Sequence, residues 1–264
     1  MTGRIRMHGQ GFDRFAPGPP GRFLFKGLCG FPGLAHGVFT RLGGSSPPPY
    51  QSLNVSYSVG DLPAFVFHNL SLIQGAVGAD RLVFMNQVHG NEILTVKDSA
   101  PGCFAGPPEA DAVITSVPRT AIIAKLADCQ GIILYDPERH VTAVVHAGWR
   151  GQVSNITARV VDRMAEEFGC RREALRAAVS PSLGPCCAEF VSYREIFPSF
   201  FRRFMVKENY FDLWNLTSFQ LQESGVLADN ISVAGLCTKC RTDLFFSYRA
   251  EGVTGRFCIV AMIR

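Results

Sequence analysis

The sequence predicts a mixed α/β fold, and three observations carry that prediction. The 264 residues are 47% apolar and 18% charged, which supplies enough apolar material for the buried core of one large domain or two small ones. Several short strand-like segments follow one another through the middle of the chain, and helices are fewer. Strict alternation of strand and helix is absent, so a Rossmann or TIM-barrel fold is disfavoured.

Eight segments are predicted strands, because they are short, mostly rich in β-branched residues and mostly bounded by turn residues. Several are apolar on both faces, which is typical of sheets that are covered on both sides. In chain order the predicted strands are Ala35–Arg41, Leu82–His89, Glu92–Lys97, Ala112–Ser116, Ala121–Ala127, Gly131–Tyr135, Val141–His146 and Phe257–Ile263.

Three helices are predicted, at Asp61–Val77, Ser154–Phe168 and Phe211–Ser224. The second has an apolar residue at every fourth position from Ile156 onward, which makes one buried face. Ser154 is its predicted N-cap, and Gly169 is predicted to end it.

Two loops rich in Pro and Gly, Gly43–Tyr50 and Ser99–Glu109, lie between predicted strands and therefore inside a domain. We expect one domain over residues 26–264. Residues 1–25 are rich in Pro and Gly and are expected to form a flexible N-terminal segment.

Charge and cysteine content narrow the possible functions. Lys plus Arg number 26 and Asp plus Glu 22, so the net charge of +4 is too mild to indicate nucleic acid or an anionic membrane as partner. No apolar run approaches the roughly 20 residues of a membrane span, and the N-terminus lacks the apolar core of a signal peptide. Nine cysteines, an odd number, indicate reduced thiols in a cytoplasmic protein rather than a disulfide scaffold.

Polar side chains stand at the ends of three apolar strands, where a sheet can hold functional groups rigidly. They offer His89, Cys129 and His146. Two imidazoles and one thiolate suit zinc or copper, and three protein ligands leave a fourth position for water or substrate. The spacing of 40 and then 17 residues matches no compact zinc-finger rule. The residues alone therefore leave a second interpretation open, with two satisfied core histidines and a buried thiol.

Two arginines at strand ends are candidates for binding an anion. Arg150 lies at a corner between a strand and a helix, where backbone N–H groups also gather. Arg41 enters a Gly-rich loop, and its guanidinium can hold phosphate or carboxylate through two hydrogen bonds. On the residues alone, a tight turn and two solvated arginines are the favoured interpretation.

Four further cysteines occur as the pair Cys186–Cys187 and as the CxxC motif of Cys237 and Cys240. A four-thiolate zinc site or a redox pair would use such residues. One CxxC is a weak signal, however, and adjacent cysteines rarely bind one metal well, so buried packing thiols are the favoured interpretation.

Short motifs along the chain carry a resemblance to a known family. They are TRLGG (Thr40–Gly44), SLN (Ser52–Asn54), VGD (Val59–Asp61), NQVHG (Asn86–Gly90), ADAVIT (Ala110–Thr115), ADC (Ala127–Cys129), HAGWRG (His146–Gly151), SLGPCC (Ser182–Cys187), LWN (Leu213–Asn215), CT (Cys237–Thr238), FSYR (Phe246–Arg249) and TGR (Thr254–Arg256). From about residue 34 onward the chain resembles the YfiH/laccase-domain family, whose animal relatives carry the FAMIN domain.

The resemblance implies a single domain of α/β/β/α layers with mixed sheets. It also implies a zinc ion held by His89, Cys129 and His146, and phosphorolysis of adenosine, inosine and methylthioadenosine together with adenosine deamination. The expected partners are a purine nucleoside and phosphate, and the expected assembly is a monomer or homodimer.

On this reading of the chemistry, four residues become candidates for substrate binding. Arg41 and Arg150 are the candidates for phosphate, while Gln87 and Asp128 are candidates for orienting the base or the metal ligands, Asp128 also as a partner of a ligating histidine. The family commonly has Thr at Leu126 and often Pro at Gln130-Gly131, so the preferred substrate is left open.

Three alternative functions are considered from the sequence, of which the first is close to excluded and the third is favoured by no feature of the sequence. A multicopper laccase needs many histidines, largely as His-x-His pairs, and the chain has six histidines and no such pair, although copper could occupy the same three ligands. A cysteine hydrolase that edits peptidoglycan precursors would use Cys129 with a histidine. The third alternative is a metal-binding interaction protein without activity.

Overall fold

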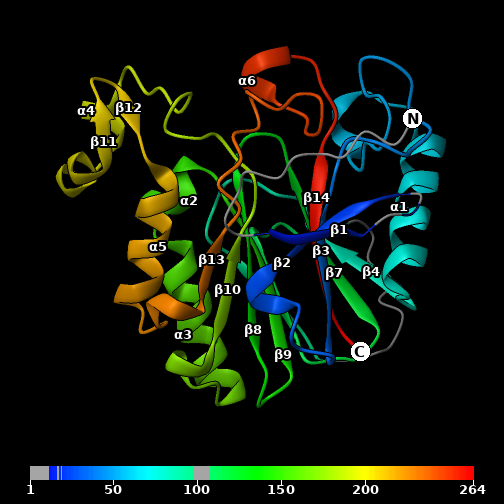
Figure 1. Ribbon diagram of the computed structural model, residues 1–264, viewed down its shortest axis with the longest axis horizontal. Coiled ribbons are helices and arrows are strands. Elements are labelled where there is room, and N and C mark those ends of the chain that lie inside the picture. The colour runs from blue at the N-terminus through cyan, green and yellow to red at the C-terminus, as the bar shows by residue number, and fades with distance from the viewer. Residues whose placement is uncertain (1–11, 17, 19, 98–106) are drawn as a thin grey trace.

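The computed structural model describes residues 12–16, 18, 20–97 and 107–264. Two six-stranded sheets pack face to face, and helices cover their outer faces (Figure 1). The α/β/β/α layering with mixed sheets is therefore confirmed. No helix among the described residues is long and apolar enough to cross a membrane.

The first sheet has the order β1-β2-β3-β14-β7-β4. Its strands are β1 (Phe12–Ala16), β2 (Arg22–Phe25), β3 (Leu34–Phe39), β14 (Phe257–Ile263), β7 (Thr120–Leu126) and β4 (Arg81–Phe84). All neighbours are antiparallel except β4 and β7. Strand β14 is buried along its whole length, because it lies in the middle of a sheet that is covered on both faces.

The second sheet has the order β13-β10-β8-β9-β6-β5. Its strands are β13 (Ile231–Val233), β10 (Arg176–Val179), β8 (Gln130–Asp136), β9 (Val141–Ala147), β6 (Ala112–Thr115) and β5 (Ile93–Val96). The central pair β8 and β9 is antiparallel, with Gly131 opposite His146. A separate ribbon joins β11 (Met205–Lys207) and β12 (Tyr210–Phe211).

Helix α1 (Pro63–Val77) covers the first sheet, and helices α3 (Ile156–Phe168) and α5 (Leu213–Glu223) cover the second. The shorter helices are α2 (Trp149–Val153), α4 (Tyr193–Ile196) and α6 (Tyr248–Glu251), with 3-10 turns at Lys26–Leu28, Tyr57–Val59, Arg172–Ala174, Ser199–Phe204 and Ala228–Asn230. The inner faces of both sheets share one apolar core, in which Val38 and Ile259 of the first sheet meet Val144 of the second.

The structure differs from three local predictions. Strand β4 ends at Phe84 rather than His89, because beyond Phe84 the backbone pairing with β7 stops and the side chain of Gln87 bonds to the Lys125 backbone instead. Helix α3 is capped by Asn155, whose side chain accepts from the N–H of Ala158, since Ser154 already ends α2. Strands β1 and β2 belong to the first sheet, so the domain begins before residue 26. Residues 1–11 of the expected N-terminal segment and residues 99–106 of the second predicted loop lie outside the described residues.

Candidate metal centre and active-site pocket

Three side chains from different parts of the chain meet above the ends of the strands. His89 follows β4, Cys129 lies at the crossing from β7 to β8, and His146 is in β9. Their candidate ligand atoms all lie within 4.8 Å of one another, and His89 Nε2 is 3.9 Å from Cys129 Sγ. The two imidazole rings are nearly perpendicular, at 81°. The predicted trio is thus brought together, and its donor set suits a borderline-soft metal ion.

Gly148 makes this close approach possible. A Cβ atom at this position would lie 2.9 Å from Cδ2 of His89 and 3.2 Å from Sγ of Cys129. Any larger residue would therefore push two of the candidate ligands apart, which explains the glycine between strand β9 and helix α2.

Asp111 connects His89 and His146, a role that was not predicted from the sequence. Its fully buried carboxylate lies 2.7 Å from His146 Nδ1 and accepts from the N–H groups of His89 at 3.1 Å and Gly90 at 2.6 Å. One carboxylate therefore fixes the backbone around His89 and occupies Nδ1 of His146, which leaves Nε2 for a metal. The sequence signals were its place in the ADAVIT motif and an acidic residue directly before the apolar strand β6.

Charge within the trio shifts the pKa values of Cys129 and His146 in opposite directions, so that their order is reversed. Burial raises the pKa of the Cys129 thiol, but the charge and hydrogen bond of His146 and the hydrogen bond of His89 outweigh burial and lower this pKa to about 6. Burial lowers the pKa of His146, but Cys129 and Asp111 outweigh it and raise this pKa to about 9. At neutral pH the pair is thus a thiolate beside an imidazolium, and a metal cation can replace the imidazolium proton.

Asp128 braces the turn that carries Cys129. Its φ of 87° is in the left-handed region, which is strained for aspartate. The carboxylate accepts from the hydroxyl of Thr238 and from the N–H of Arg249, both at 2.6 Å, and the Asp128 carbonyl accepts from the N–H of Leu183. Asp128 therefore holds the turn. The carboxylate that bonds a candidate histidine ligand, a role considered for Asp128, belongs to Asp111.

Gln87 is also held by backbone rather than directed at open space. Its amide donates to the carbonyl of Lys125 and accepts from the N–H of Lys125, both at 2.8 Å. Gln87 lines the pocket, but these two bonds fasten the loop around His89 to strand β7.

The trio opens into a pocket of about 510 Å³, a volume typical of small-molecule sites. Four cationic side chains line it: Lys125, Arg150, Arg249 and Arg256. Within the described part of the chain, no carboxylate forms an ion pair with Arg150, which stacks on Trp149. Burial and the nearby charge of Arg256 hold the pKa of Lys125 below its usual value. Apart from Arg150, sequence reasoning missed these cations, although two of them lie in the FSYR and TGR motifs.

Arg41 does not join this pocket. Its guanidinium is 2.8 Å from the Glu251 carboxylate, donates to the carbonyls of Gln51 and Thr242, and lies over the ring of Phe246. The Arg41 guanidinium therefore joins two loops. Its position at the end of a strand does not make it a phosphate ligand in this pocket.

Replacing Asp111 by Asn tests its orienting role. We expect the zinc dissociation constant of the trio to rise about 10- to 100-fold, because a carboxylate behind a ligating histidine contributes that much. Competition with a chromophoric chelator measures this constant. The exposed Glu109, changed to Gln, is the matched control and should leave it unchanged. Equal zinc affinity in the two variants would contradict the orienting role of Asp111.

Comparison with known proteins places this pocket in a family. The purine nucleoside phosphorylase of Deinococcus radiodurans is 34% identical over 259 residues, covering 93% of this chain and 93% of that protein. The mouse purine nucleoside phosphorylase LACC1 is 30% identical over 83% of this chain, which spans only about half, 53%, of the mouse protein. The crystal structure of the hypothetical protein YfiH from Bacillus licheniformis matches with a TM-score of 0.86 at 28% identity, covering 96% of this chain and 100% of that one.

The family model described as multi-copper polyphenol oxidoreductase laccase matches residues 35–264. That range contains the three candidate metal ligands, Asp111 and the four pocket cations. The chain therefore belongs to this laccase-like, YfiH-type family.

Proposed function

We propose that the protein is a metal-dependent purine nucleoside phosphorylase. The observation that carries this proposal is a single pocket that combines the trio His89, Cys129 and His146 with four cationic side chains. Relatives at about 30% identity bear the name purine nucleoside phosphorylase. Phosphorolysis requires a site for a doubly charged anion beside a site for an uncharged nucleoside, and this pocket offers both kinds of surface.

Zinc is the metal that we propose for the trio. Two imidazoles and one thiolate match its ligand preference, and bound there it would supply a Lewis acid with one position open to water or substrate. The chain contributes the rest of the arrangement: Asp111 orients His146, and Asp128 holds the turn that presents Cys129.

The cationic side chains would hold phosphate and offset negative charge as the bond between base and sugar breaks. Arg150 and Arg256 are the proposed phosphate ligands, since a guanidinium can donate two parallel hydrogen bonds to phosphate oxygens. Phe190, Tyr248 and Trp149 line the same pocket and give a purine ring aromatic faces on which to stack.

The finer assignments rest on the resemblance to the YfiH/laccase-domain family. We propose adenosine, inosine and methylthioadenosine as nucleosides for phosphorolysis, in which phosphate takes the place of the base at C1′ of the sugar. As a second reaction we propose adenosine deamination, in which water attacks C6 of the purine and the amino group leaves as ammonia. The two reactions differ in the atom that is attacked, so the first needs C1′ and the second needs C6 beside the attacking group.

Product chromatography tests the function directly. Metal-quantified protein is incubated with adenosine or inosine, with and without phosphate. We expect free adenine or hypoxanthine only when phosphate is present, and inosine from adenosine without phosphate. Zinc-loaded protein that leaves every nucleoside intact would refute phosphorolysis, and base released equally well without phosphate would indicate hydrolysis instead.

Replacing Arg150 by Ala tests the phosphate site. We expect the KM for phosphate to rise about 10-fold, the effect of losing one charge-assisted hydrogen bond, while the KM for nucleoside changes little. Arg163, which pairs with Glu167 on the surface of α3, offers the matched control Arg163→Ala. A normal phosphate KM in Arg150→Ala would assign phosphate to the other cations.

A cysteine hydrolase is the second candidate, because the lowered pKa of Cys129 beside His146 is the arrangement of a nucleophile and its base. The two candidates differ in the metal. A thiolate bound to zinc is a poor free nucleophile, whereas a hydrolase needs the thiolate free.

Iodoacetamide labelling separates these candidates. In chelator-treated protein we expect Cys129 to react at neutral pH and to slow as the pH falls through about 6, where its thiolate takes up a proton. In zinc-loaded protein the same cysteine should be protected at every pH. Peptide mapping, with Cys129→Ser as control, measures the label. Rapid labelling with zinc present, together with cleavage of a muropeptide, would favour the hydrolase.

A further inference from the structure

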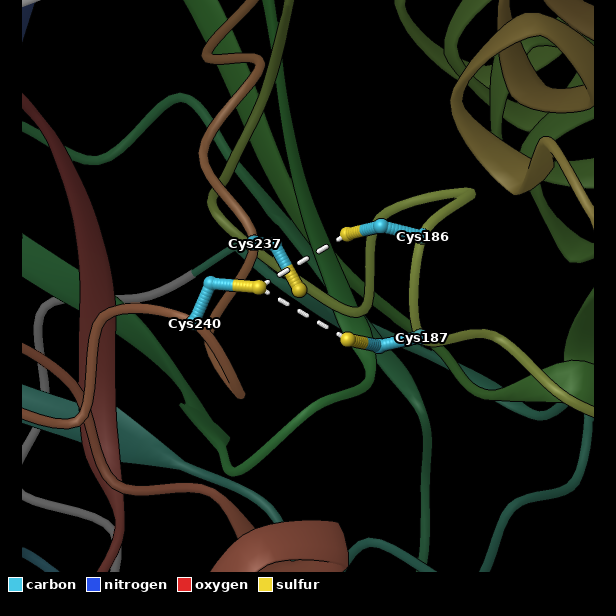
Figure 2. Close-up of side chains that lie close together, drawn as sticks. All are labelled: Cys186, Cys187, Cys237 and Cys240. Carbon is cyan, nitrogen blue, oxygen red and sulfur yellow. Dashed lines mark hydrogen bonds between the residues drawn. The ribbon is translucent and has the colours of Figure 1, made fainter.

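We propose that Cys186, Cys187, Cys237 and Cys240 form a second metal site, which binds one zinc ion and has a structural role. The four sulfur atoms lie within 4.8 Å of one another and converge from two loops (Figure 2). This site is separate from the trio in the pocket, and the two share no residue.

The spacing of the sulfurs fits one tetrahedral ion. Zn–S bonds of about 2.3 Å place the corners of a regular tetrahedron about 3.8 Å apart. Cys240 Sγ lies 3.7 Å from that of Cys186 and 3.6 Å from that of Cys187. All four cysteines are free, and these separations far exceed the roughly 2.05 Å of a disulfide. Sulfurs this close surround a single ion and leave no room for a cluster of several irons.

The turn after Gly184 resolves the objection to adjacent cysteine ligands. The N–H groups of Cys187 and Ala188 both donate to the Gly184 carbonyl at 2.9 Å, which curls the chain tightly. The curl directs both neighbouring thiols toward Cys240, as Figure 2 shows.

The CxxC turn completes the set on the opposite side. Backbone N–H groups of Gly184 and Cys240 donate to the sulfur of Cys237, and N–H donors of this kind commonly stabilise thiolates that bind metal. Cys237 is buried, whereas Cys186 and Cys240 are exposed. Packing of thiols in a core does not account for two exposed ones, and the exposed side gives an ion a way in.

Backbone hydrogen bonds hold the two loops side by side. Ser182 and Cys237 form a parallel bridge, in which the N–H of Ser182 donates to Leu236 and the N–H of Thr238 donates to Ser182. This bridge brings the Cys186–Cys187 pair and the CxxC turn close together.

A structural role follows from the ligand number and from the neighbours. Four protein ligands close the coordination of zinc and leave no position for substrate. The same loops carry Thr238 and Leu183, which hold Asp128 next to Cys129. Zinc at the four cysteines would therefore fix one wall of the pocket without touching the substrate.

Cobalt titration of the full chain tests the site. The Cys129→Ser variant removes the thiolate of the pocket trio, so any strong thiolate-to-cobalt absorption must come from the four cysteines. We expect one equivalent of Co²⁺ to produce the charge-transfer band and the intense visible bands of a tetrahedral four-thiolate complex. Zinc should then displace the cobalt and abolish both bands.

Zinc counting by elemental analysis gives the second measurement. We expect the reduced wild-type chain to lose one zinc on Cys240→Ser, while Lys239→Ala, a change of the exposed residue within the same turn, keeps it. If Cys240→Ser fails to fold, the cobalt titration alone decides. Absence of the four-thiolate bands, iron in place of zinc, or a disulfide among these cysteines in the freshly isolated protein would overturn the proposal.

Discussion

The pocket depends on the hydrogen bonds of the buried Asp111 carboxylate, because they join the two sheets where the candidate ligands meet. His89 follows a strand of the first sheet, and His146 belongs to the second. Placing a carboxylate in the interior costs several kcal/mol unless partners compensate. Here the His146 ring and the backbone N–H groups around His89 supply them. Hydrogen bonds from His146 and Gly90 outweigh the effect of burial and keep the pKa of Asp111 below its usual value.

A single residue, Asp128, likewise holds several loops together around Cys129. Asp128 collects bonds from Thr238, Arg249 and Leu183, which come from three later segments of the chain. The thiolate therefore sits at a point where distant segments converge. The proposed four-cysteine site lies behind the same wall, so a metal there would act on the pocket through backbone geometry rather than through charge.

Continuous apolar strands were predictable from the sequence, and contacts across the chain were not. Strand β14 agrees residue for residue with its prediction, because a seven-residue apolar run that contains β-branched residues is too short for a buried helix. Strand β4 was predicted too long, because its end depends on Gln87 bonding to Lys125, 38 residues away. Arg41 was placed in a phosphate site by local pattern, whereas its partner Glu251 lies 210 residues further on. The ligand trio was identified through shared motifs; the role of Asp111 is visible only in three dimensions.

The position of β14 also governs how the chain can be built. This strand, residues 257–263, lies between β3 and β7 and pairs with both. A ribosome releases β3 and β7 long before it makes their common neighbour, so each keeps an unpaired, apolar edge in the growing chain. Such edges can pair with other strands until β14 has been made. Fusion or truncation near residue 257 would thus lower the yield of folded protein before it altered the catalytic rate.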